Sequence, residues 1–196
     1  AAFGEVLAGA GKGYRDVVVV TLGTGVGGGI IIDGKIYTGF NFCGAELGHT
    51  VIQYGGRQCG CGRKGCFEAS SATAIINMTR ESMEAHRDSK MWEICSGSID
   101  NVDGKTAFDG WRAGDKAASD VVDMYISYLG CGLTNIVNTF QPEVLLIGGG
   151  ICKEGENLTK PLEEIIAKEA YCIDPKQSTK LGICELGNDA GIIGAA

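Results

Sequence analysis

The chain has 196 residues and a formal net charge of −7, with 17 Lys and Arg against 24 Asp and Glu. A chain of this length buries a substantial core and corresponds to about one large domain. Its acidity and the lack of a basic run argue against a dominant nucleic-acid surface, because phosphate binding needs clustered Lys and Arg. No apolar stretch reaches the roughly 20 residues that span a bilayer, so we expect a soluble protein.

The N-terminal third predicts a helix followed by a strand meander. Residues 1–9 resemble the middle of a helix, with neither a methionine nor a capping residue before them, and we expect the chain to be a fragment of a longer protein. Residues 17–22 are a run rich in β-branched side chains, which predicts a buried strand. After a glycine loop over 23–29, residues 30–37 predict a hairpin with an Asp-Gly turn.

The rest of the chain predicts alternating helices and strands after a cysteine-rich loop over 45–68. Ser70 or Ser71 is expected to cap the first of these helices, and residues 86–104 are expected to be irregular. The predicted helices cover residues 72–85, 105–113, 115–141 and 161–170, and the predicted strands cover residues 144–147 and 181–186. A strand meander followed by helix–strand alternation indicates an α/β fold with a mixed sheet.

The cysteine-rich loop holds four side chains of the kind that bind zinc. They are His49, Cys59, Cys61 and Cys66, within eighteen residues. Four such ligands close a tetrahedral site that builds structure and leaves no position open for chemistry. We favour a structural zinc site, and the alternative is a coincidental group of free thiols.

The other cysteines favour a reducing compartment. Cys43, Cys95, Cys131, Cys152, Cys172 and Cys184 are scattered through apolar or mixed segments, as small core residues are. The chain is too long to need disulfide staples and shows no signal-peptide pattern at its start. We therefore expect reduced cysteines and a cytoplasmic location.

Two carboxylates stand at the ends of the cysteine-rich loop. Glu46 precedes His49 by three residues, and Glu68 follows Cys66 by two. Carboxylates held in a loop that a metal fixes are suited to accept hydrogen bonds from a polyhydroxylated ligand.

The glycine loop over 23–29 fits the G-x-G-x-x-G pattern but not its structural context. A dinucleotide site of that kind needs a helix directly after the loop, and here a strand follows. A glycine hairpin can still bring backbone amides and the Thr24 hydroxyl to a phosphate, although a plain tight hairpin is the alternative. A second glycine run, 148–150, follows a buried strand, where α/β sheets place their ligands. Together the two runs favour nucleotide binding.

Four motifs make the chain resemble the ROK family of sugar kinases and repressors. They lie at residues 22–29, 46–49, 59–68 and 142–150. The pair E-x-G-H and C-x-C-G-x-x-G-C-x-E is highly specific, and the resemblance extends over effectively the whole chain. Within the family, the surroundings of the motifs are most similar to those of bacterial glucokinases.

The resemblance implies an actin-like, ribonuclease-H-like ATPase fold with a mixed sheet, flanking helices and a zinc-bound loop. Residues 1–196 would be the larger C-terminal domain, with the zinc loop at 45–68 as a subregion, and the N-terminal domain would be absent from this chain. A sugar cleft would lie between the two domains.

The resemblance also assigns site residues. Glu46, His49 and Glu68 would hydrogen-bond sugar hydroxyls; Thr24 and Gly25 would face the ATP phosphates, and Gly148 and Gly149 the adenosine. His49 would serve twice, with one ring nitrogen on zinc and the other toward the sugar, so that the metal fixes the ring orientation.

Phosphoryl transfer needs a positioned nucleophile, a base and charge neutralisation by Mg²⁺. The family's base is an aspartate just before an Ala-x-Gly-Glu element, which here is residues 2–5. That aspartate would lie upstream of Ala1, so no residue of this chain is predicted to be the base. We expect residues 1–196 alone to be inactive.

The sequence thus predicts part of a kinase that transfers phosphate from ATP with Mg²⁺ to a hexose, most simply glucose, to give glucose 6-phosphate. A homodimer that binds neither membrane nor nucleic acid is expected. The alternative is the sugar-sensing domain of a ROK-type repressor, and the intact nucleotide-side glycines favour the kinase. An isolated zinc module leaves the two glycine runs unexplained. The identity of the sugar stays open.

Overall fold

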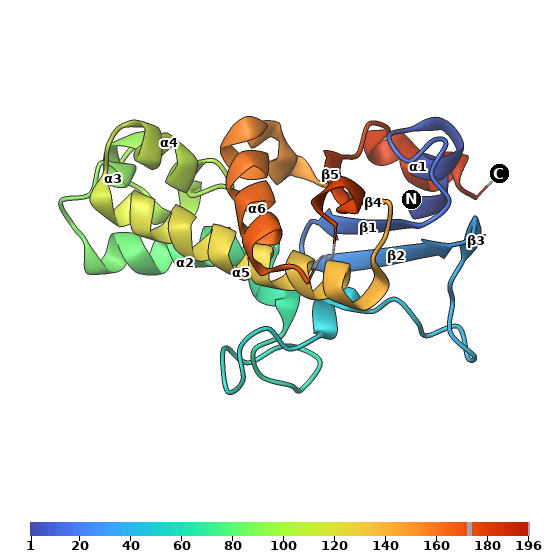
Figure 1. Cartoon of the computed structure of the whole chain (residues 1–196). Coiled ribbons are helices and arrows are strands. Elements are labelled where there is room, and N and C mark those ends of the chain that lie inside the picture. Colours follow the sequence, from blue (N-terminus) through green and yellow to red (C-terminus); the bar gives the residue numbers. More distant parts are fainter. Residues whose placement is uncertain (172–173, 196) are drawn as a thin grey trace.

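A mixed five-stranded sheet forms the centre of the molecule, in a computed structural model that describes residues 1–171 and 174–195 (Figure 1). The strands lie in the order β3-β2-β1-β4-β5. Their bounds are β1 Val17–Leu22, β2 Val26–Ile32, β3 Lys35–Ile36, β4 Val144–Gly148 and β5 Lys180–Ile183. β2 runs antiparallel to β1 and β3, whereas β4 runs parallel to β1 and β5. The predicted mixed sheet is confirmed.

Helices flank this sheet and extend beyond it. They are α1 Ala2–Ala8, α2 Ala72–Ala85, α3 Met91–Ile94, α4 Thr106–Arg112, α5 Lys116–Phe140, α6 Glu156–Glu169 and α7 Ala190–Ile193. The 3₁₀ turns are η1 Leu47–His49, η2 Phe67–Ser70, η3 Ile99–Asn101, η4 Gly150–Glu154, η5 Pro175–Gln177 and η6 Gly187–Asp189. No helix in the described part of the chain is long and apolar enough to cross a membrane.

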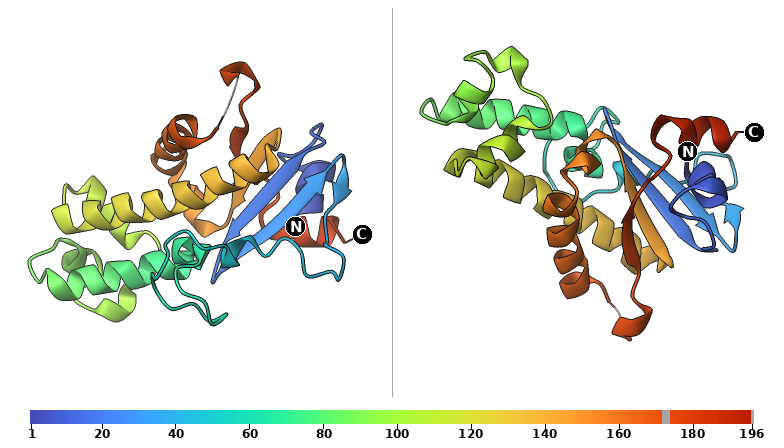
Figure 2. Two further views of the ribbon diagram at one scale, coloured as in Figure 1. Left: turned by 60° about the horizontal axis from the view of Figure 1, so that its bottom comes forward. Right: turned by 90° about the horizontal axis from the view of Figure 1, so that it is seen from above.

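Both faces of the sheet are buried, which explains the run of four valines in β1. Val18 and Val20 join the main core with α5 and α6, whereas Val17 and Val19 pack on the opposite face toward α1. Figure 2 shows α5 and α6 on one side of the sheet and α1 with α7 on the other.

The helices α2, α3 and α4 and the N-terminal part of α5 form a lobe beyond the end of the sheet (Figure 1), with a core of its own that includes Met83 and Met91. The prediction of an irregular segment over 86–104 is wrong, because α3 and η3 lie within it. The indole N–H of Trp92 donates to the carbonyl of Met83 at 3.0 Å and ties this short helix to the end of α2. Such a tertiary anchor leaves no periodic pattern in the sequence.

Two predicted element starts are also wrong. β2 begins at Val26, so three glycines of the predicted loop lie in the strand. A Cβ on Gly28 would lie 2.4 Å from the carbonyl oxygen of Ala45, so the bare strand admits the segment that leads into η1. α6 begins at Glu156 and holds Pro161 inside the helix, whereas Pro161 was expected to open it.

The predicted helix starts at α2 and α5 are confirmed. Of the two candidate serines, Ser71 caps α2, and its side chain accepts the N–H of Ala74 at 3.0 Å. The Asp115 carboxylate caps α5 by accepting the N–H of Ala118 at 2.8 Å. α5 ends at Phe140, and the next residue, Gln141, adopts the left-handed conformation with φ of 44°.

Carboxylates join the N-terminal ends of β1 and β4 and the C-terminal end of β2. Oε2 of Glu143 accepts the backbone N–H groups of Arg15 at 2.6 Å and Asp16 at 3.1 Å. Oδ1 of Asp16 accepts the N–H of Asp33 at 2.7 Å. The hydrogen bond from Arg15, followed by that from Asp16, holds the pKa of the Glu143 carboxyl below its usual value.

The described cysteines are all free. Cys95 and Cys152 are buried and Cys131 and Cys184 are half-buried, as expected of core thiols, but Cys43 is exposed. The prediction fails at Cys43 because it lies in a loop that leaves the sheet. Cys172 lies outside the described residues.

Gly132 allows α5 to pack closely on η2. A Cβ at this position would lie 2.1 to 2.4 Å from three ring atoms of Phe67, which is fully buried. Alanine would gain about 1 kcal/mol of helix propensity over glycine, but overpacking a core costs about 1–3 kcal/mol. We therefore expect Gly132→Ala to lower the free energy of unfolding, measured by urea denaturation. Gly191→Ala in α7 is the control, since nothing lies within 4 Å of its added methyl group; a Gly132→Ala protein as stable as wild type would contradict the prediction.

Candidate functional site

A pocket of about 840 Å³ opens at the C-terminal ends of β1 and β4. Because the two strands are parallel, with Thr21 paired to Gly148, the glycine turns that follow them meet at one edge of the sheet. Gly149 has φ of 118°, and a Cβ there would lie 2.1 Å from the carbonyl oxygen of Leu22. Only glycine fits at this point, so the second turn presents bare backbone to the pocket.

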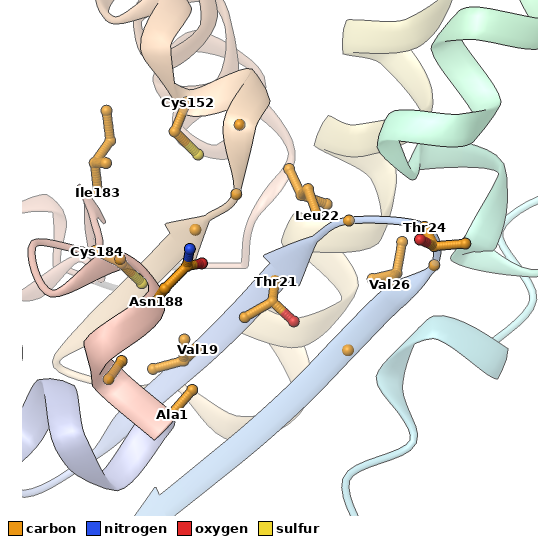
Figure 3. A pocket seen from close by; sticks show the side chains of 18 of the residues that line it. Ala1, Val19, Thr21, Leu22, Thr24, Val26, Cys152, Ile183, Cys184 and Asn188 are labelled. Carbon is orange, nitrogen blue, oxygen red and sulfur yellow. The ribbon is translucent and has the colours of Figure 1, made fainter. Parts of the chain in front are cut away.

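The structure brings all the predicted ligand-binding residues to this one pocket. Its lining includes Thr24, Gly25, Glu46, His49, Glu68, Gly148 and Gly149. Figure 3 shows Thr24 and Val26 at one side of the pocket and Ile183, Cys184 and Asn188 at the other, with Val19 and Thr21 between them. Residues more than 100 positions apart in the sequence therefore share one binding surface.

Glu46 and His49 are positioned by η1, which packs on the first glycine hairpin. The N–H of His49 donates to the carbonyl of Glu46 at 3.1 Å, and the hydroxyl of Thr50 donates to the carbonyl of Leu47 at 2.7 Å. A Cβ on Gly48 would lie 2.2 Å from the carbonyl oxygen of Val26. The turn that carries two predicted sugar ligands thus lies in contact with the backbone of the hairpin.

Glu68 contacts the hairpin directly. Its Oε1 accepts the backbone N–H of Val26 at 2.8 Å, and its Oε2 has no hydrogen-bond partner within the described ranges. Glu68 is the second residue of η2, and Cys66 directly precedes that turn. One carboxylate oxygen therefore remains available to a ligand, and the other supports the glycine hairpin.

The four predicted metal ligands form one cluster. Their ligand atoms all lie within 4.8 Å of one another. Nδ1 of His49 lies 3.7 Å from Sγ of Cys59, and Sγ of Cys61 lies 3.6 Å from Sγ of Cys66. Tetrahedral zinc, with Zn–S of about 2.3 Å and Zn–N of about 2.0 Å, separates its ligand atoms by about 3.5–3.8 Å. The donor set and its spacing fit a zinc ion, and Nδ1 is the nitrogen that faces the cluster.

The loop around the cluster is held by its own backbone. The N–H of Cys59 donates to the carbonyl of Arg63 at 2.9 Å, and the Arg63 guanidinium donates to the carbonyl of His49 at 2.9 Å. Gly65 has φ of 76°, and a Cβ there would lie 1.6 Å from the carbonyl oxygen of Gln53. Gly65 of this motif is therefore required by the fold of the loop.

Two thiols of the cluster have pKa values shifted in opposite directions. Burial and, after it, the neighbouring sulfurs of Cys61 and Cys59 raise the pKa of Cys66 to about 12. A hydrogen bond from the backbone of Arg63 is the largest influence on Cys61 and lowers its pKa. A metal ion held between these sulfurs would favour their thiolate form.

Other pocket residues carried no signal strong enough to be predicted. Asn188 and Lys153 supply polar groups, and Cys152 and Cys184 supply thiols. Burial raises the pKa of Cys152 to about 11 and that of Cys184 to about 12, so both are neutral at pH 7. The glycine beside Asn188, Gly187 with φ of 53°, is the one local feature of the sequence that marks this turn.

Glu5, the last residue of the Ala-x-Gly-Glu element, was not predicted to line the pocket. It is 1% exposed and lines the pocket from α1. Its Oε2 accepts the N–H groups of Ala10 at 3.0 Å and Glu185 at 3.1 Å, and its Oε1 accepts that of Leu186 at 2.9 Å. This buried carboxylate ties α1 to the segment before η6, which forms one wall of the pocket.

Comparison with known proteins identifies the family of this chain. The ROK family model matches residues 1–196. The chain belongs to the ROK family. The glycine turns, the E-x-G-H motif and the cysteine motif described above are thus parts of a ROK domain.

Several ROK proteins are similar over the whole chain. A glucokinase from Halalkalibacterium halodurans is 40% identical over 198 residues, which cover 99% of this chain and 59% of that protein. The crystal structure of a ROK family glucokinase from Streptomyces griseus in complex with glucose and AMPPNP superposes with a TM-score of 0.88 at 33% identity, covering 100% of this chain and 64% of the other. A ROK family transcriptional regulator, a homolog of E. coli MLC protein, has a TM-score of 0.82 at 28% identity, covering 99% and 48%. The chain spans about three fifths of the length of the glucokinases that it matches.

Proposed function

We propose that this chain forms the larger, C-terminal domain of an ATP-dependent ROK sugar kinase that phosphorylates glucose. The observation that carries the proposal is the single pocket lined by Glu46, His49 and Glu68 and by the glycine turns at 23–25 and 148–150. Its two ends differ in chemistry: carboxylates and an imidazole suit sugar hydroxyls, and bare backbone amides suit phosphates. The similar glucokinase with bound glucose and AMPPNP supports the same pair of ligands.

Each residue has a chemical role in this proposal. Glu46, His49 and the free oxygen of Glu68 hydrogen-bond the sugar, Thr24 and Gly25 face the phosphates, and the second glycine turn lies against the nucleoside. Mg²⁺ bound to ATP would neutralise charge on the transferred phosphoryl group. We expect the general base, an aspartate, to come from outside residues 1–196, so that none of these side chains acts as the base.

The metal cluster holds the sugar end of the pocket in place. We propose that zinc is bound by Nδ1 of His49 and by Cys59, Cys61 and Cys66, which leaves Nε2 of His49 for a sugar hydroxyl. Ligation would supply no chemistry to the reaction but would fix the ring orientation. A cytoplasmic homodimer that binds glucose and ATP and no nucleic acid is the corresponding expectation for the complete protein.

A sugar-sensing repressor domain is the second candidate, because the structure of a ROK transcriptional regulator superposes on this chain as well. The two functions differ in one measurement. A kinase forms ADP in proportion to glucose when ATP and Mg²⁺ are present, whereas a sensor binds glucose without turnover. The complete protein, loaded with zinc, is the material for this assay.

A substitution at Glu46 tests the sugar end without touching the metal ligands. Glu46 is exposed at the pocket and precedes η1. We expect Glu46→Gln to lower kcat/KM for glucose by about 10- to 150-fold, the range for one hydrogen bond to a charged group. Glu93→Gln, at an exposed site on α3, is the control and should behave as wild type. Equal kcat/KM values in the two variants would exclude Glu46 from the sugar site.

A further inference from the structure

Val26 lies between the two segments that carry the proposed sugar ligands. Its N–H donates to Oε1 of Glu68 in η2, at 2.8 Å, and its carbonyl oxygen is so close to Gly48 in η1 that a Cβ there would lie 2.2 Å away. Val26 also opens β2, directly after the turn at 23–25. The backbone of one residue therefore touches both sugar-side turns and belongs to the nucleotide-side hairpin.

Glu68 also lies against the turn itself. A Cβ on Gly25 would lie 2.6 Å from Oε1 and 3.0 Å from Oε2 of Glu68, so a side chain at this position would have to push the carboxylate aside. The carboxylate thus covers the backbone of Gly25, the residue proposed to face the ATP phosphates. Gly23, two residues earlier in the same turn, has open space where a Cβ would be.

We propose that Glu68 is a positioning residue that couples sugar binding to nucleotide binding. This inference rests on the proposed kinase function and adds a regulatory property to the same site. One carboxylate oxygen holds the N–H of Val26 and fixes the hairpin, while the other accepts a sugar hydroxyl. A bound sugar restrains the carboxylate, and the restrained carboxylate holds the glycine turn in the form that the phosphates need.

Electrostatics gives the coupling its sign. Without sugar, the Glu68 carboxylate lies beside a turn that must receive the phosphates of ATP, and like charges at short range repel. A sugar hydroxyl that donates to Oε2 disperses part of this charge and keeps the carboxylate from turning toward the phosphates. Glucose should therefore tighten nucleotide binding, and by linkage the nucleotide should tighten glucose binding by the same factor.

Calorimetric titrations of the complete, zinc-loaded protein test the coupling. The glucose Kd is measured with and without saturating AMPPNP and MgCl₂, and the ratio of the two values is the coupling factor. We expect a factor of about 5 to 150 for wild type, the usual range for coupled sites. Gly25→Ala displaces the Glu68 carboxylate, so we expect its factor to fall below about 2 and its glucose Kd without nucleotide to rise. If Gly25 affected nucleotide binding alone, the glucose Kd measured without nucleotide would stay unchanged in Gly25→Ala.

Two further variants complete the test. Gly191→Ala adds the same methyl group in open space on α7, at a residue that does not line the pocket, and its coupling factor should stay at the wild-type value. Glu68→Asp shortens the side chain by one methylene, so its carboxylate cannot reach both Val26 and the sugar; its factor should also fall below about 2, which keeps the test open if Gly25→Ala does not fold.

The outcomes separate the inference from the proposed function. A wild-type factor near 1, or a wild-type factor retained in Gly25→Ala and Glu68→Asp, would overturn the coupling role while leaving a kinase intact. A coupling factor retained in both variants would indicate that the coupling arises from closure of this domain against the expected N-terminal domain. A wild-type protein that binds no glucose and turns over no ATP with it would instead overturn the kinase function.

Discussion

Replacing Cys61 by alanine is expected to remove the bound metal and to lower both stability and sugar affinity. Cys61 is exposed, so the loss of its side chain opens no cavity, and a large effect must come from the lost ligand. We expect the affinity for zinc to fall by more than about 100-fold, which corresponds to about 2.7 kcal/mol of folding free energy. The glucose Kd should rise in parallel, because His49 is both a cluster member and a pocket residue.

Metal content, thermal unfolding and glucose binding are the measurements. Wild type should carry about one zinc per chain. Cys43→Ala removes another exposed thiol outside the cluster and should match wild type in all three. A wild-type protein without metal, its four ligands intact and reduced, would show that the zinc assignment is wrong; full sugar affinity in metal-free Cys61→Ala would show that the metal does not orient His49.

Replacing Glu5 by alanine is expected to destabilise the protein by about 3–5 kcal/mol. Three partly buried backbone N–H groups, those of Ala10, Glu185 and Leu186, would lose their acceptor, and an unsatisfied donor costs about 1–3 kcal/mol where it is fully buried. The segment after Leu186 carries Asn188, which lines the pocket. Nucleotide affinity should therefore fall together with stability.

Urea denaturation and nucleotide titration check this expectation. Glu5→Gln keeps the volume but replaces one acceptor by a donor that faces backbone N–H groups, so we expect a loss of about 2 kcal/mol. Glu84→Ala, at an exposed site on α2, is the control and should change stability by no more than about 0.5 kcal/mol. A Glu5→Ala protein as stable as this control would mean that water replaces the carboxylate without cost.

The sequence predicted the elements that carry a strong local pattern. The four consecutive valines of β1 are typical of a buried strand, and the apolar positions of α5 repeat at helical spacing. Both elements begin where expected. β2 was shortened because glycine is a poor strand former, whereas here Gly28 is needed for the close approach of Ala45. The start of α6 was missed because Pro161 is usually a first-turn residue.

The predicted site residues were located, but their contacts with each other were not. Motif spacing placed Glu68 beside the metal ligands and Gly25 in a turn. Nothing in the sequence indicates that these two residues, 43 positions apart, are in contact. That contact depends on how η2 packs on the hairpin, which is a property of the tertiary fold. Glu5 and Asn188 were missed as pocket residues for the same reason, because α1 and η6 reach the pocket from opposite ends of the chain.

The valines of β1 leave open how its neighbours align with it. Val17 to Val20 are four identical side chains, so a shift by two residues would place valine against much the same surroundings on either face. The carboxylate of Glu143, which holds the N–H groups of Arg15 and Asp16, permits one alignment of β4 with β1. The side-chain carboxylate of Asp16, which holds the N–H of Asp33, does the same for β2. The hydrogen bonds of Glu143 and Asp16 at one end of the strands therefore fix a strand register that the valines leave undetermined. That register sets how the two glycine turns align at the pocket, at the other end of the strands.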